Sequence, residues 1–85
     1  MVLVFDKAAL KVLWKMQPKA FSSMMDRLEA IAADPLKPHP NVTAMQGMPN
    51  VFRLRQGDWR AVYEVDRKAG VMRVMKVGQR GKVYR

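Results

Sequence analysis

Residues 51–85, VFRLRQGDWRAVYEVDRKAGVMRVMKVGQRGKVYR, decide the fold of this chain. Apolar and basic residues alternate along the stretch, and short breaks that contain glycine divide it into runs. A period of two residues is typical of strands that bury one face and expose the other. We therefore expect strands over residues 51–55, 59–65 and 71–77. The two turns between them are short, which predicts an antiparallel meander.

The exposed face of these strands is rich in arginine. The alternation predicts that Phe52 and Leu54 share one face of the first strand. Arg53 and Arg55 then share the other face, about 7 Å apart by strand rise. Arg60 follows the turn and can approach them across the ladder. Guanidinium groups bind phosphate with two hydrogen bonds and can stabilise the charge of a phosphoryl-transfer transition state. Arginine is also common on strand faces that bind nothing, so both interpretations stay open.

The first 33 residues predict one strand and two helices. Residues 2–5 form a short apolar run that suits a strand buried on both faces. Asp6 can cap a helix over residues 7–16. Pro18 suits the first turn of a second helix, over residues 18–33. Both helices carry apolar stripes at helical spacing, which we interpret as core in a helical hairpin.

Residues 34–50 contain four prolines, which predicts an extended loop. The single histidine, His39, lies in this loop and is expected to be solvated rather than catalytic, because no metal or acid partner lies at useful spacing. The expected order is β-α-α-β-β-β. This is an α+β fold in which a helical hairpin packs on one face of a small, mostly antiparallel sheet.

The chain has 85 residues, which predicts a single domain over residues 1–85. Its net charge is +9, and residues 43–85 carry ten basic and three acidic groups. A concentrated positive field attracts polyanions, most commonly nucleic acid.

Cysteine does not occur, which excludes disulfides and agrees with a reducing cytoplasm. Neither a secretion signal nor a transmembrane stretch is evident, so no membrane partner is expected.

Several catalytic classes lack their motifs in this sequence. There is no phosphate-binding loop, no dinucleotide fingerprint and no His-Glu-x-x-His zinc motif. The seven acidic residues form no evident metal pair, which disfavours a metal-dependent nuclease. We therefore expect neither a cofactor nor a metal.

The sequence resembles the RelE branch of the RelE/ParE toxins of bacterial toxin–antitoxin pairs. The resemblance includes Phe5-Asp6, Ala9-Leu10-Lys11 and Trp14. From Gly47 onward it is strong, through GMPNVFRLRQGDWRAVYEV, VMRVMKVGQR and the final VYR. An Arg-x-Arg strand, a glycine turn, an aromatic-Arg-x-x-Tyr strand and a Val-Gly-x-Arg exit are specific in combination.

The resemblance implies a barnase-like ribonuclease fold and cleavage of mRNA in the ribosomal decoding site. There the ribose 2′-OH attacks the adjacent phosphate without a metal, leaving a 2′,3′-cyclic phosphate and a 5′-OH. The implied catalytic positions are Arg53, Arg55, Arg60, Arg80 and Tyr84. The implied roles are phosphate binding and 2′-OH polarisation for the first two, and transition-state stabilisation for the third. Arg80 favours departure of the 5′ oxygen, and Tyr84 stacks on or orients the nucleotide. We also expect Lys76, Lys82 and Arg85 to bind RNA.

Two departures from the family pattern stand out. Positions 53 and 55 are often lysine in the family but are arginine here, and arginine cannot act as a base because it stays protonated. The general base is therefore unassigned. The sequence stops one residue after Tyr84, so we expect no counterpart of the C-terminal helix of some relatives, and the spacing between Arg80 and Tyr84 is short.

Two other functions fit the same residues. One is inhibition of DNA gyrase by a ParE-like toxin of the same fold. The other is an inactive basic module that binds nucleic acid or the ribosome. Either toxin function implies a cognate, RelB-like antitoxin in a toxin–antitoxin hetero-oligomer, and we expect this antitoxin to be acidic and partly disordered before binding. The endonuclease function also implies the ribosome and mRNA as partners.

Overall fold

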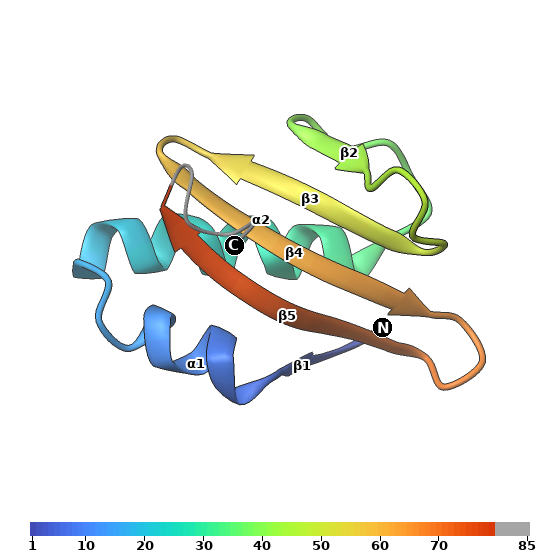
Figure 1. The fold of residues 1–85 in the computed structure, drawn as a ribbon, viewed down its shortest axis with the longest axis horizontal. Helices are drawn as coiled ribbons and strands as arrows, with labels where there is room; N and C mark the ends of the chain where they lie inside the picture. Colours follow the sequence, from blue (N-terminus) through green and yellow to red (C-terminus); the bar gives the residue numbers. More distant parts are fainter. Residues whose placement is uncertain (80–85) are drawn as a thin grey trace.

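Two helices pack on one face of a five-stranded sheet (Figure 1). The structure, a computed structural model, describes residues 1–79. Along the chain the elements are β1 (Val2–Phe5), α1 (Lys7–Leu13), α2 (Pro18–Ala33), β2 (Val42–Ala44), β3 (Val51–Gln56), β4 (Trp59–Asp66) and β5 (Val71–Gln79). The spatial order of the strands is β1-β5-β4-β3-β2. Only the β1–β5 pair is parallel among the pairs of this sheet, so the predicted α+β architecture is confirmed.

The meander forms as the alternation predicts. Strands β3, β4 and β5 pair in sequence and antiparallel. The β3–β4 turn holds only Gly57 and Asp58, because Gln56 already pairs with Trp59. Gly57 has a φ of 60°, which glycine adopts without steric cost. A positive φ at the first of two loop residues is the pattern of a type II′ hairpin turn, whose twist matches that of the strands.

The proline-rich segment contains one strand that the sequence reasoning missed. Strand β2 pairs with β3, with Thr43 opposite Arg53. The prolines flank this strand without entering it, so its three residues can donate to the ladder. Asn41, with a φ of 61°, makes the bend before the strand. The prediction of a continuous loop was therefore wrong at these three residues.

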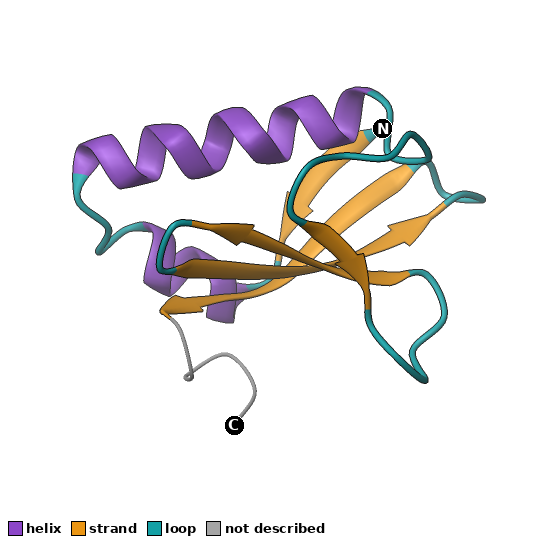
Figure 2. Cartoon of the chain, turned by 90° about the horizontal axis from the view of Figure 1, so that it is seen from above, coloured by secondary structure: helices purple, strands orange, loops and turns teal. Residues whose placement is uncertain are grey.

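Strand β1 lies at the sheet edge rather than at its centre. The side chain of Val2 is 64% exposed, and the three residues that follow are only partly buried. The prediction of a strand buried on both faces was wrong, because the helices cover one face of the sheet and leave the other open. Figure 2 shows α2 lying along the covered face of the twisted sheet.

Helix α2 has the expected bounds, whereas α1 ends three residues early, at Leu13. Pro18 forces Gln17 into an extended conformation, with a ψ of 143°, so the chain must leave the helix before it. Asp6 occupies the N-cap position, yet its side chain makes no capping hydrogen bond. The expected role of the Asp6 carboxylate as a helix cap was therefore wrong.

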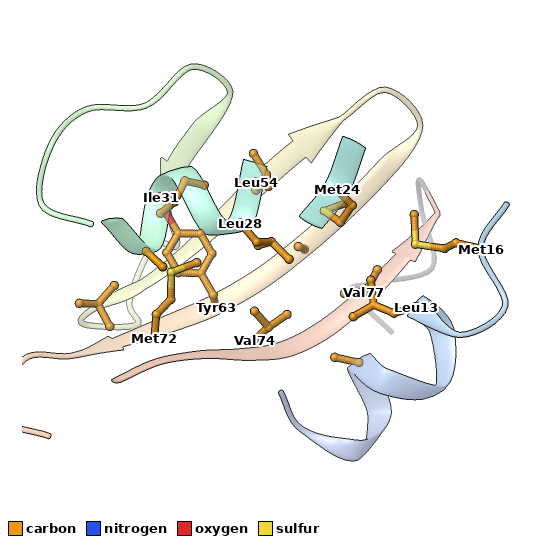
Figure 3. Packing of buried hydrophobic residues seen from close by; sticks show 14 residues of the cluster. Leu13, Met16, Met24, Leu28, Ile31, Leu54, Tyr63, Met72, Val74 and Val77 are labelled. Atoms are coloured by element: carbon orange, nitrogen blue, oxygen red, sulfur yellow. The ribbon is translucent and has the colours of Figure 1, made fainter. Parts of the chain in front are cut away.

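The core lies between the helices and the sheet (Figure 3). Leu28 and Ile31 of α2 meet Tyr63 and Leu54 of the sheet, and all four side chains are essentially fully buried. The Tyr63 ring also stacks on Phe52, with ring centroids 5.5 Å apart. Burying large side chains stabilises the fold by about 1.5–3 kcal/mol each, before chain entropy is subtracted. The sheet is therefore anchored from its helical side, which leaves the other face available.

In the described part of the chain, neither helix has the length and apolar content that crossing a bilayer requires.

Candidate nucleic-acid interface

The face of the sheet that points away from the helices carries the arginines. Phe52 and Leu54 pack into the main core. Because successive side chains of a strand point to opposite faces, Arg53 and Arg55 lie on the open face. Arg53 is partly buried and Arg55 is exposed. The predicted division of β3 into an apolar and a basic face is confirmed.

Arg60 joins this face from the neighbouring strand. It lies directly opposite Arg55 in the β3–β4 ladder. Side chains that are directly opposite share a face, with Cβ atoms about 5 Å apart, and like charges in such a pair are destabilising. The strands thus place two guanidinium groups at a spacing that costs stability unless an anion lies between them.

The turn holds the Arg60 side chain in place. Its Nη1 donates to the carbonyl oxygens of Gly57 and Trp59, each at 3.1 Å. Within residues 1–79 the Nε and Nη2 groups make no hydrogen bond. Gly78 lies opposite Arg60 on the other side, in β5, and places no side chain beside it. Arg60 is therefore oriented by one nitrogen and can bind a ligand with the others.

A β-bulge adds Lys76 to the same face. Val62 pairs with Lys76 and the next residue, Tyr63, pairs with Val74, so Met75 is an extra residue in β5. Val62 belongs to a small apolar cluster separate from the main core, and its partner Lys76 shares its face. We call Arg53, Arg55, Arg60 and Lys76 the cationic quartet.

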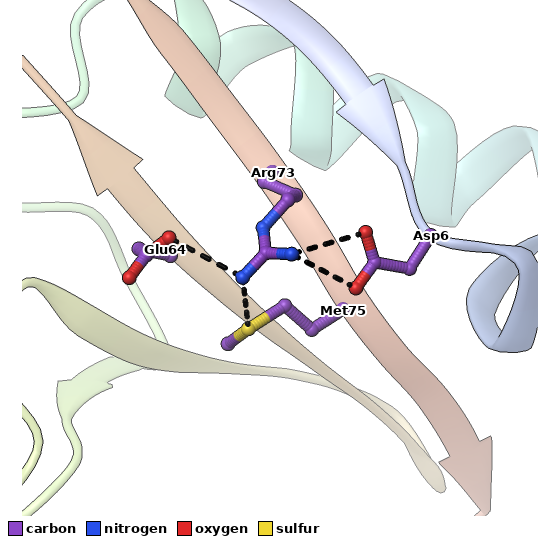
Figure 4. A network of polar contacts seen from close by, with 4 residues as sticks. All are labelled: Asp6, Glu64, Arg73 and Met75. Carbon is purple, nitrogen blue, oxygen red and sulfur yellow. Dashed lines mark hydrogen bonds and ion pairs between the residues drawn. The ribbon is translucent and has the colours of Figure 1, made fainter.

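Arg73 also lies on the open face but is neutralised, as Figure 4 shows. Its guanidinium contacts Asp6 Oδ2 and Glu64 Oε1, each at 3.4 Å, and the sulfur of Met75 at 3.4 Å. Sequence reasoning missed this network because Asp6 and Arg73 are 67 residues apart and meet only through the parallel β1–β5 pairing. The positive charge of the open face is consequently concentrated at the quartet.

Four predicted site residues cannot be placed. Arg80, Lys82, Tyr84 and Arg85 lie outside the described residues. The described chain ends at Gln79, which pairs with Trp59 next to Arg60. Of the eight predicted positions, the structure therefore brings together the four that form the quartet.

His39 has a structural contact rather than a place on the arginine face. Its Nε2 donates to the Asp34 carbonyl oxygen at 2.7 Å, and the ring is partly buried. Arg27 donates to the Pro40 carbonyl oxygen of the same loop. These contacts tie the loop to the end of α2.

Among residues 1–79, no three His, Cys, Asp or Glu side chains come together as a possible metal site.

The helical side carries a second unusual surface, an apolar hollow of about 100 Å³. Its lining is entirely apolar: Phe5, Leu10, Leu13, Trp14, Phe21 and Met25. Trp14 is 82% exposed. Leu10 and Phe21, which the stripes placed in the core, are more than one third exposed. An exposed cluster of large apolar side chains marks an interaction surface.

These features define a small α+β protein with a cationic sheet face opposite a helical pair. The chain matches, over residues 3–84, the family model of the ParE toxin of the type II toxin–antitoxin system parDE. It therefore belongs to that family, within the RelE/ParE toxin superfamily, and is a toxin of the type II toxin–antitoxin class. The resemblance inferred from the sequence is confirmed.

Solved structures of RelE toxins agree with the assignment to the RelE/ParE superfamily. The isolated E. coli RelE toxin superposes with a TM-score of 0.82 at 25% identity, over 98% of this chain and 87% of that one. RelE in the E. coli RelBE toxin–antitoxin complex gives 0.80 at 28% identity, over 95% and 98%. The RelE–RelB complex of Pyrococcus horikoshii gives 0.81 at 21% identity, over 96% and 97%, and shows likeness of fold alone. Among curated proteins, none matches.

Proposed function

We propose that this toxin is a metal-independent mRNA endonuclease that acts in the decoding site of the ribosome. The observation that carries the proposal is the directly opposed pair Arg55–Arg60, flanked by Arg53 and Lys76 on the open face. Four cations on one sheet face suit a phosphate-rich substrate. The likeness to RelE toxins at 25% and 28% identity also supports the proposal of an mRNA endonuclease. The proposed reaction takes place in the cytoplasm, where ribosomes are.

The proposed chemistry is intramolecular transesterification. The 2′ oxygen of the ribose forms a bond to the adjacent phosphorus and the bond from phosphorus to the 5′ oxygen breaks. The products are a 2′,3′-cyclic phosphate and a 5′-OH. Arg53 and Arg55 hold the phosphate, and Arg60 stabilises the added charge of the pentavalent transition state, because preorganised donors act most strongly where charge develops. Arg60 suits this role since the turn fixes its orientation.

The residues beyond 79 complete the proposed site. We assign Arg80 to the departing 5′ oxygen and Tyr84 to stacking on a base. We assign Lys82 and Arg85, together with Lys76, to binding the RNA backbone. The roles of Arg80 and Tyr84 rest on the sequence resemblance, and those of the lysines and Arg85 rest on their positive charge.

A cognate antitoxin is the proposed partner. The relatives in the E. coli and P. horikoshii complexes were crystallised with RelB antitoxins. We propose that an acidic amphipathic helix of the antitoxin docks in the hollow around Trp14. The hollow is apolar, and the exposed lysines Lys7, Lys11 and Lys19 lie on α1 and α2, with exposed Lys15 in the turn between the two helices. An apolar hollow with exposed lysines on the same helices fits a helix with one apolar and one acidic face.

Inhibition of DNA gyrase is the second candidate, favoured by the match to the ParE toxin model. Expression of the toxin in cells separates the two functions. Primer extension on mRNA detects breaks within codons if the toxin is an endonuclease. Double-strand DNA breaks with intact mRNA would instead indicate gyrase.

Three variants sharpen this experiment. Arg60→Ala and Arg80→Ala should each relieve growth arrest and remove the mRNA breaks. Arg67→Ala is the matched control, because Arg67 is an exposed arginine in the turn at the opposite end of β4. If both site variants arrest growth as fully as the control, the assignment of the site is wrong. Purified toxin that binds ribosomes and leaves mRNA whole would indicate an inactive binding module.

A further inference from the structure

The cationic quartet contains one side chain that can accept a proton. Attack by a ribose 2′-OH requires that its proton be removed. The guanidinium groups of Arg53, Arg55 and Arg60 stay protonated in proteins and cannot remove it. Lysine can act as a general base when its amine is neutral. Among the four side chains of the quartet, Lys76 is therefore the one whose chemistry fits this step.

The β-bulge at Met75 is what brings Lys76 to the site. In a regular strand, Val74 and Lys76 would point to the same face, and Val74 is buried in the main core. The extra residue turns Lys76 to the open face, opposite Val62. Bulges often re-aim a side chain next to an active site. The chain thus has a local irregularity whose effect is to add a lysine to three arginines.

The surroundings of Lys76 on the open face are cationic. Arg60 is its diagonal neighbour, since Arg60 pairs with Gly78, two residues further along β5. Cβ atoms in such diagonal pairs lie about 7–8 Å apart, within reach of long side chains. Val62 of β4 pairs with Lys76 on one side and with Arg53 of β3 on the other, so Arg53 and Lys76 share the open face with Val62 between them. On the other side of β5, Asp6 follows the end of β1, and its carboxylate contacts Arg73.

Glu64 is the competing base on this face. Its carboxylate contacts Arg73 at 3.4 Å, and Glu64 lies two residues beyond Val62 along β4, away from the Arg55–Arg60 pair. A carboxylate that already holds a guanidinium is less available to a proton of the substrate. Lys76 has no ion pair among the described residues, and its side chain is exposed.

We propose that Lys76 is the general base of the cleavage reaction, a role that rests on the proposed ribonuclease function. The neutral Lys76 amine takes the proton of the 2′-OH as the 2′ oxygen bonds to phosphorus. The bond between phosphorus and the 5′ oxygen breaks, and the 5′ oxygen takes a proton from water. The resulting hydroxide is neutralised by the Lys76 ammonium, which restores the free amine. Atoms and charge therefore balance without a metal or a co-reactant.

The test compares Lys76→Arg, Lys76→Gln and Glu64→Gln with the wild type in single-turnover cleavage of mRNA on purified ribosomes. Lys76→Arg keeps the positive charge but cannot give up its proton. We expect it to bind ribosomes within threefold of wild type and to cleave roughly 10²–10⁴-fold more slowly, the range that general-base catalysis contributes. Glu64→Gln should cleave within threefold of wild type.

A compensating change provides a second readout. Arg53→Lys returns a titratable amine to the site and should recover part of the rate in the Lys76→Arg background. Cleavage by Lys76→Arg at the wild-type rate would overturn the proposal, as would loss of activity in Glu64→Gln alone. If the wild type itself does not cleave mRNA on ribosomes, the ribonuclease function fails. Active wild type with active Lys76→Arg overturns only the role of Lys76.

Discussion

Arg55 and Arg60 lie directly opposite each other in the β3–β4 ladder, on the face of the sheet that the helices leave open. Two like charges at this spacing repel each other, so the pair lowers the stability of the free protein. A phosphate between them would turn the repulsion into two sets of charge-assisted hydrogen bonds. The arrangement is thus unfavourable for folding and favourable for binding an anion.

Replacing one arginine of this pair should separate stability from activity. We expect Arg60→Ala to cleave about 10²–10³-fold more slowly, as when a preorganised transition-state donor is removed. Its free energy of unfolding should stay the same or rise by up to about 1 kcal/mol, because the repulsion is relieved. Urea unfolding and ribosome-dependent cleavage, with Arg67→Ala as the control, measure both effects. A large loss of stability in Arg60→Ala would show that the pair supports the fold instead.

The contact between Asp6 and Arg73 should contribute modestly to stability. The side chains of Arg73 and Asp6 are 44% and 37% exposed, so water and salt screen the pair. We expect Asp6→Asn to lower the free energy of unfolding by about 0.5 kcal/mol at low salt, and by less in 1 M salt. Asparagine caps helices as well as aspartate does. If Asp6 acted as a cap rather than as a partner of Arg73, the substitution would be neutral at every salt concentration.

Trp14 should decide the affinity for the antitoxin. Its ring is 82% exposed in the free toxin, so removing it costs little folding energy. We expect Trp14→Ala to weaken antitoxin binding by at least 2 kcal/mol, the usual size for a hot-spot aromatic residue, while mRNA cleavage is unchanged. Isothermal titration with the purified antitoxin measures the effect. Leu36→Ala, at another exposed apolar side chain outside the hollow, is the control and should bind normally.

Tyr63 should make stability sensitive to alkaline pH. Burial raises the pKa of Tyr63 from 10.0 to about 12, and the nearby positive charge of Arg27 acts in the opposite direction. The folded protein therefore keeps a proton that the unfolded chain loses first. The corresponding stability is fully present below pH 10 and is lost as the pH rises towards about 12. The loss amounts to at most about 3 kcal/mol.

The comparison with Tyr63→Phe isolates this effect. Phenylalanine keeps the buried ring that supplies the packing, so the two proteins should have similar stability near pH 7. Between pH 10 and 12 the wild type should lose stability relative to the variant. Parallel curves for the two proteins over that range would contradict the assigned pKa.

The sequence predicts the elements whose signals are local. The alternation around Arg53 and Arg55 predicts β3 and its two faces, and Pro18 marks the first residue of α2. The sequence does not predict β2, because a three-residue strand between prolines is stable only through its pairing with β3. Pairing between distant segments has no local signature.

The features of the candidate site also divide into those with a local signal in the sequence and those that depend on strand pairing. The approach of Arg60 to Arg53 and Arg55 follows from the short turn that the sequence predicts, whereas its place directly opposite Arg55 depends on the Gln56–Trp59 pair, which shortens that turn to two residues. The orientation of Lys76 depends on the bulge at Met75, and alternation alone would have turned it towards the core. The partner of Arg73 depends on the parallel register that brings β1 beside β5. Phe21 belongs to an apolar stripe that indicated core, yet it lines the hollow and is 38% exposed.

The central claim is that this toxin cuts mRNA on the ribosome. The most direct measurement adds the purified toxin to ribosomes that hold a defined mRNA with an empty decoding site, and then analyses the RNA ends. We predict one cut within the codon in that site, leaving a 2′,3′-cyclic phosphate and a 5′-OH, and no cut with Arg60→Ala. Intact mRNA, together with inhibition of DNA supercoiling by gyrase at the same toxin concentration, would contradict the account.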